Sequence, residues 1–145
     1  MSQKIRLIDQ LQRNSVALIS LVIAISSLGY NTWRNEASEH NRNQRVVSIE
    51  VLRNVGELQQ LVYHSHWDME DRDKGNPLTG WALVLTIKDL SQLLDGDAPD
   101  AGTALWKVWD DNWQLLGDDR EGYDKIIDGL AGVRQSTNAL LRSLD

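Results

Sequence analysis

Cysteine and phenylalanine are both absent from the 145-residue chain, and proline occurs only twice. Without cysteine the protein can form no disulfide, no thiolate metal site and no cysteine nucleophile. The scarcity of proline, together with few runs of β-branched residues, favours helices over strands. Tryptophan is used instead of phenylalanine and occurs at six positions: Trp33, Trp67, Trp81, Trp106, Trp109 and Trp113.

Motifs that carry catalysis are also missing. The sequence contains no G-x-S-x-G, no P-loop, no G-x-G-x-x-G and no H-E-x-x-H. No carboxylate lies inside an apolar run, which is the setting that prepares a carboxyl group for acid catalysis. We therefore expect a protein that is not an enzyme and that holds no cofactor.

Charge is unevenly distributed along the chain. Of its 15 basic and 21 acidic residues, only Lys4, Arg6, Arg13 and Asp9 precede residue 34. The remaining 12 basic and 20 acidic residues give segment 34–145 a net charge of −8. An acidic body without a basic stripe repels phosphate backbones, so we expect no nucleic-acid partner.

A long uncharged segment separates Arg13 from Arg34 and contains 20 residues. As a helix it would extend about 30 Å, which is the thickness of the hydrocarbon core of a bilayer. Tyr30 and Trp33 stand at its C-terminal end, where amphipathic rings favour the membrane interface. The pattern predicts a transmembrane helix over residues 15–33, with the lipid bilayer as partner.

Two alternatives compete with a membrane anchor. The segment could be the buried helix of a soluble protein, but little of so small a chain remains to surround it. It could also be a cleaved signal peptide, but residues 26–30 make a poor A-x-A cleavage site. We expect an uncleaved anchor preceded by a short amphipathic tail, residues 1–14.

The charges that flank this anchor favour neither of its two orientations, N-terminus inside or N-terminus outside. Equal numbers of Lys and Arg flank the two ends: Lys4, Arg6 and Arg13 against Arg34, Arg42 and Arg45. Moving a basic tail outward opposes the membrane potential. We expect a single-pass protein of the cell inner membrane, with a cytoplasmic N-terminus and a periplasmic C-terminal domain.

The residues after the anchor predict more helix. Segment 34–45 is polar and contains no glycine or proline, which predicts a helical stalk. Four amphipathic helices follow. The first carries the apolar stripe Val51, Val55, Leu58 and Val62. The second begins at Asn76 and Pro77 and is apolar on several sides, so we expect it to be the most buried.

The last two helices have clear apolar stripes. The third carries Leu105, Trp109, Trp113 and Leu116. The fourth carries Tyr123, Ile126, Leu130, Val133, Thr137, Leu140 and Leu144. Gly129 and Gly132 flank the fourth stripe and would permit a close helix approach. Short loops make successive helices antiparallel neighbours. The expected class is all-α: one N-terminal transmembrane helix that continues through the stalk into an antiparallel four-helix bundle, residues 46–145.

The sequence around the end of the apolar segment resembles a known group of proteins. The motifs are Y-N-T-W-R-N-E at residues 30–36, N-R-N-x-R at residues 41–45 and G-E-L-Q at residues 56–59. They are similar to uncharacterised single-span inner-membrane proteins of proteobacteria. The resemblance covers roughly residues 15–60. It implies a bacterial inner-membrane anchor and adds no chemistry.

One cluster of possible metal ligands follows the first amphipathic helix. His64 and Asp68 are four residues apart, so on a helix both could reach one divalent ion. The competing interpretation is a solvated, acidic helix end, in which His66 points away from the other two. We expect no metal site, and name His64 and Asp68 as the residues that would hold one.

Trp106 is the tryptophan that departs from the stripe of the third helix. Tryptophans at helical spacing usually fill a core, but tryptophan is also enriched at partner surfaces. Trp106 is therefore the residue of this cluster that we expect at a possible partner surface.

Two functions remain compatible with these patterns. The first is a non-catalytic, membrane-anchored accessory or scaffold protein that acts through helix–helix association, as a homo-oligomer or in a larger membrane complex. The second is a periplasmic ligand-sensing helical bundle that relays its signal through a partner; this one rests on analogy of fold.

Overall fold

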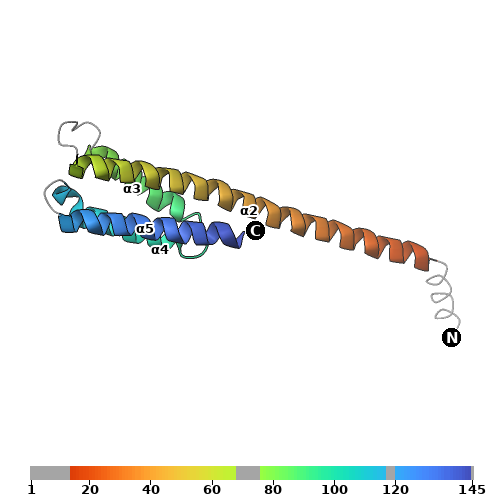
Figure 1. Cartoon of the computed structure of the whole chain (residues 1–145). Helices are drawn as coiled ribbons and strands as arrows, with labels where there is room; N and C mark the ends of the chain where they lie inside the picture. Colours follow the sequence, from red (N-terminus) through yellow and green to blue (C-terminus); the bar gives the residue numbers. More distant parts are fainter. Residues whose placement is uncertain (1–13, 68–75, 117–119, 145) are drawn as a thin grey trace. The chain divides into compact units, whose positions relative to one another are not determined.

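The chain is all-helical throughout the part that the computed structural model describes, residues 14–67, 76–116 and 120–144. Figure 1 shows the elements in order. They are α2 (Ser15–Trp67), α3 (Pro77–Ser91), α4 (Ala98–Asn112), the 3₁₀ turn η1 (Trp113–Leu115) and α5 (Arg120–Ser143). The predicted helical class is confirmed, and no strand occurs in these ranges.

Helix α2 is 53 residues long and contains no proline. The chain divides within it into two compact units, one ending at His40 and one beginning at Asn41. The sequence pattern placed the polar stalk as far as Arg45, but Gln44 already belongs to the second unit and is only 5% exposed. The predicted amphipathic tail lies outside the described residues, except for Asn14.

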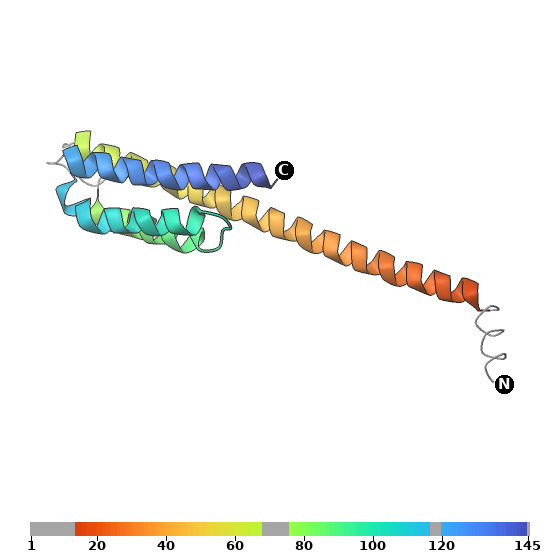
Figure 2. The same ribbon diagram turned by 90° about the horizontal axis from the view of Figure 1, so that it is seen from below.

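The second unit has one hydrophobic core, to which α2, α3, α4 and α5 all contribute (Figures 1 and 2). Its fully buried side chains include Val51, Val55, Leu58 and Val62 of α2 and Ile126, Leu130, Val133 and Thr137 of α5. The three–four spacing selected all of these residues, so both stripes are confirmed there. Tyr123 and Leu144, at the two ends of the predicted α5 stripe, are half-buried against the core.

Helix α3 begins as its sequence predicts. The Asn76 side chain accepts a hydrogen bond from the backbone N–H of Leu78 at 2.9 Å, and Pro77 occupies the first turn. The expectation that α3 is the most buried helix is wrong. Leu78 is 77% exposed and Leu85 is also exposed, because neighbouring helices cover only the side that carries Val84 and Ile87.

Glycines set how closely the helices of this unit approach. A Cβ added to Gly80 would collide with the six-membered ring of Trp109, so the backbone of α3 lies directly against this side chain of α4. A Cβ on Gly129 would lie 3.1 Å from Leu105 Cδ1. Gly129 therefore has the packing role that its position predicted, whereas a Cβ on Gly132 meets nothing within 4 Å.

Candidate functional site

The apolar segment of α2 exposes all of its large side chains. Within the first unit, α2 provides one helix that is long and apolar enough to cross a membrane, and none of that window is buried. The exposed aliphatic residues are Val16, Leu18, Ile19, Leu21, Val22, Ile23, Ile25 and Leu28. A continuous surface of this kind is far more apolar than water-facing helices normally are.

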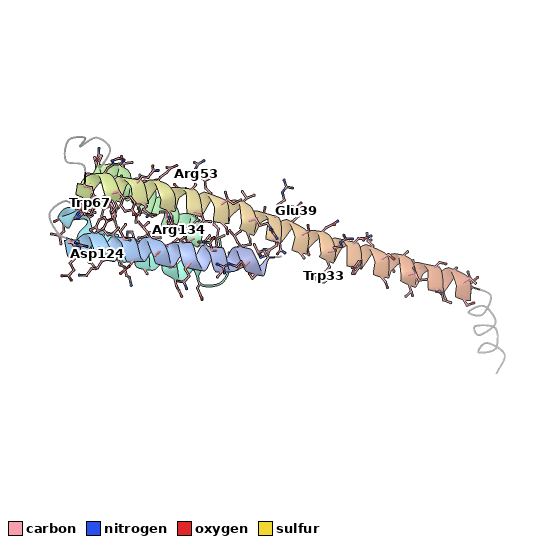
Figure 3. All side chains as sticks on the ribbon, viewed as in Figure 1. Trp33, Glu39, Arg53, Trp67, Asp124 and Arg134 are labelled. Carbon is pink, nitrogen blue, oxygen red and sulfur yellow. The ribbon has the colours of Figure 1, made fainter. Side chains whose placement is uncertain are left out.

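Tyr30 and Trp33 stand at the end of this segment, and Figure 3 labels Trp33. They are 60% and 65% exposed, and their ring centroids lie 6.2 Å apart. Two rings on one helix turn, next to Arg34, the first charged residue after the apolar segment, have the amphipathic character of a membrane-interface pair. Their role at such an interface remains a prediction.

The predicted metal ligands are not brought together in the described structure. Asp68 lies outside the described residues, and His64 lines a shallow hollow between α2 and α3. Across residues 14–67, 76–116 and 120–144, no group of three His, Cys, Asp or Glu side chains could hold an ion.

His66 has a packing role that sequence analysis missed. Its ring stacks on Tyr123 of α5 with centroids 4.4 Å apart, and Trp67 meets it edge-on at 4.8 Å. Tyr63 lies 6.3 Å from Tyr123. These four rings pack the C-terminal end of α2 against the N-terminal end of α5. Helical spacing alone gave no signal for this contact, because it joins residues 57 positions apart.

A second aromatic group consists of Trp81 of α3, Trp109 of α4 and Trp113 of η1. Trp109 is fully buried, and Trp81 meets both Trp109 and Trp113 edge-on, at 6.4 and 6.2 Å between centroids. Such geometry is favoured by the aromatic quadrupole. These three rings therefore act as core, which is the commoner role for tryptophans at helical spacing.

Trp106 is half-buried rather than fully exposed. The ammonium group of Lys88 on α3 lies 4.2 Å from its ring centroid, which is cation–π geometry. The ring thus links α3 to α4 and keeps part of its surface open to solvent. Its assignment to a partner surface remains a prediction.

Two polar side chains at the beginning of the second unit, Gln44 and Arg45, form hydrogen bonds to distant backbone groups. The Gln44 amide donates to Leu93 O at 3.1 Å and accepts from the Asp95 N–H at 3.0 Å. Arg45 donates to Leu144 O at 2.7 Å. Farther along, Arg134 of α5 donates to Gln59 Oε1 at 2.7 Å (Figure 3). The polar stretch after the apolar segment therefore anchors the loop before α4 and the end of α5.

A groove of about 480 Å³ opens between α4 and α5, and we call it the α4–α5 groove. Its lining is mostly small, with two acidic residues at one end: Ala101, Ala104, Gly132, Gln135, Ser136, Ala139, Asp97 and Asp100. Gly132 costs the helix roughly 1 kcal/mol relative to alanine. Because no neighbour crowds it, packing within the chain does not explain this glycine.

Comparison of the chain with models of protein families, with curated proteins and with solved structures finds no match.

Proposed function

We propose that the protein is a non-catalytic scaffold or accessory protein, anchored in a bacterial inner membrane by residues 15–33. In this proposal residues 46–145 form an antiparallel four-helix bundle that associates with a second copy or with a larger membrane complex. One observation carries it. Helix α2 contains an exposed apolar segment of membrane-spanning length, and the same helix forms one wall of the core of the second unit.

The chemistry of the two units supports an anchor rather than a catalyst. Placing the exposed aliphatic side chains of α2 in lipid removes a large apolar surface from water. Among the described buried polar side chains, Gln44 ties α2 to the loop before α4. Asn54, Asn112 and Thr137 donate to the backbone carbonyl four residues earlier in their own helices. The basic tail supports a cytoplasmic N-terminus. The acidic second unit does not oppose a periplasmic C-terminal domain, because Asp and Glu contribute little to orientation.

Alkaline carbonate extraction of bacterial membranes tests the anchor. The full chain should stay in the membrane pellet, and Ile23→Arg should shift it toward the soluble fraction because a central charge opposes insertion. Leu78→Arg is the matched control, since Leu78 is equally apolar and exposed but lies in the second unit. An extractable wild-type chain, or equal behaviour of both variants, would refute the anchor.

One observation favours the alternative of a ligand-sensing bundle. A hollow of about 290 Å³ between α2 and α3 combines polar and apolar side chains: Glu57, Gln60, Leu61, His64, Thr79 and Leu83. A ligand bound there would raise the melting temperature of the chain by mass action. A thermal-shift screen of small amines, carboxylates and divalent cations tests it, with Leu83→Trp as the variant that fills the hollow. Equal shifts for both forms exclude this site.

A further inference from the structure

Helix α2 carries an exposed apolar patch in the second unit, on the side that faces away from the core. Val46 and Ile49 are 61% and 62% exposed, whereas Val51 is completely buried. At about 100° per residue, these two side chains lie roughly 140° and 160° around the helix from Val51. No described element of the second unit covers these two β-branched aliphatic side chains.

Basic residues flank this patch. Arg42 precedes Val46, and Arg53 follows Ile49 with its side chain 66% exposed. Arg53 lies 3.1 Å from Glu50 and 3.6 Å from Glu57, in exposed ion pairs that contribute little to stability. We call Arg42, Val46, Ile49 and Arg53 the α2 ridge.

The α4–α5 groove offers open space and a charge opposite to that of the ridge arginines. Its floor of Ala101, Ala104 and Gly132 leaves room for bulky aliphatic side chains. Asp97 and Asp100 supply negative charge at one end, opposite in sign to the arginines of the ridge. A second chain that approaches the helix at Gly132 would explain why this open position carries glycine.

Contacts within the second unit place the ridge and the groove at the same level. Gln44 binds Leu93 and Asp95, so the chain just before α4 lies beside the start of the ridge. Farther along, a Cβ on Gly80 would touch both Leu61 and Trp109, which sets these two residues at one height. The acidic start of α4 and the ridge residues Val46, Ile49 and Arg53 therefore lie between these two levels, and Arg42 lies just before the first of them.

We propose that the α4–α5 groove of one copy receives the α2 ridge of a second copy. This inference rests on the proposed membrane anchor, because copies anchored in the same orientation hold equivalent residues at equal height above the bilayer. Ridge and groove are different surfaces, so the contact is heterologous and each copy keeps one free ridge or groove for a further neighbour. The occupant is thus the chain itself, assembled side by side in the membrane.

The absence of cysteine makes a direct cross-linking test possible. Two differently tagged full-length copies are co-expressed, one with Ile49→Cys and the other with Ala104→Cys, and native membranes are treated with a mild oxidant. A disulfide needs Cα atoms within about 7 Å. We expect a mixed disulfide between the two tags. The control pairs Ala104→Cys with Leu78→Cys, which is exposed but off the ridge, and should give none.

Charge reversal tests the specificity of the contact. Asp97→Lys with Asp100→Lys in the groove copy should abolish the mixed disulfide, and Arg42→Glu with Arg53→Glu in the ridge copy should restore it. Asp110→Lys with Asp111→Lys, two exposed residues at the other end of α4, is the matched control and should leave cross-linking unchanged.

Each other outcome overturns a distinct claim. If Ile49→Cys copies link mainly to one another, the chains meet by two-fold symmetry through α2 and the groove is not the docking site. If no disulfide forms while every variant stays in the membrane, the docking is refuted and the anchor stands. If the mixed disulfide forms but the protein is recovered in the soluble fraction, the docking stands and the anchor fails.

Discussion

The indole ring of Trp109 on α4 lies directly against the backbone of Gly80 on α3, leaving no room for even one methyl group. Trp109 is the largest fully buried side chain of the second unit. The contact explains how α3 and α4 approach closely enough to bury so large a ring, and it depends on glycine at one position.

We expect Gly80→Ala to destabilise the second unit by about 1–3 kcal/mol, because overpacking forces the ring or the helix to shift. The loss lowers the melting temperature by several degrees, measured by circular dichroism of the full chain in mild detergent.

Gly132→Ala is the matched control, since it also adds one methyl group to a helix interior. A Cβ there meets nothing, so we expect a gain of roughly 0.5–1 kcal/mol from helix propensity. The same direction of change in both variants would contradict the packing described for Gly80.

Core stripes could be predicted from the sequence because a three–four repeat reports directly which side of a helix faces apolar neighbours. This holds for the α5 stripe through Ile126 and Leu130. It fails for α3, where apolar residues occur on several sides and nothing local shows which side has a neighbour. Leu78 and Leu85 therefore look like core in the sequence and are exposed in the structure.

Contacts between distant segments were not predictable in the same way. The ring stack of His66 on Tyr123 and the bonds of Gln44 to the loop before α4 depend on how the helices are placed. The roles of Gly129 and Gly132 also differ, although the two residues are three apart on one helix. A glycine marks a close approach only where another element comes near it.

Leu130 and Arg42 provide a test of the core. Leu130→Asp should unfold the second unit, because an unpaired carboxylate at a site 1% exposed costs several kcal/mol against a total stability of about 5–15. Arg42→Ala changes an exposed residue and should shift stability by no more than about 0.5 kcal/mol. Denaturant unfolding of both variants measures the difference, and equal midpoints would refute the packing.

Removal of the apolar segment tests the boundary between the two units. A fragment of residues 34–145 should be soluble and strongly helical by circular dichroism, since every core residue lies beyond Gln44. A fragment of residues 46–145 loses the bonds of Gln44 and Arg45 and should melt at a lower temperature. Insoluble material from the longer fragment would show that the second unit needs the first.

The central claim is that the apolar segment crosses the membrane once and places the second unit outside the cytoplasm. Fusion of a reporter after Asp145 tests it most directly, because alkaline phosphatase is active only outside the cytoplasm and a cytoplasmic fluorescent protein is bright only inside. The basic tail of Lys4, Arg6 and Arg13 should stay inside, so we predict active phosphatase and a dark fluorescent fusion. Inactive phosphatase together with a bright fluorescent fusion would contradict this topology and place the acidic second unit in the cytoplasm.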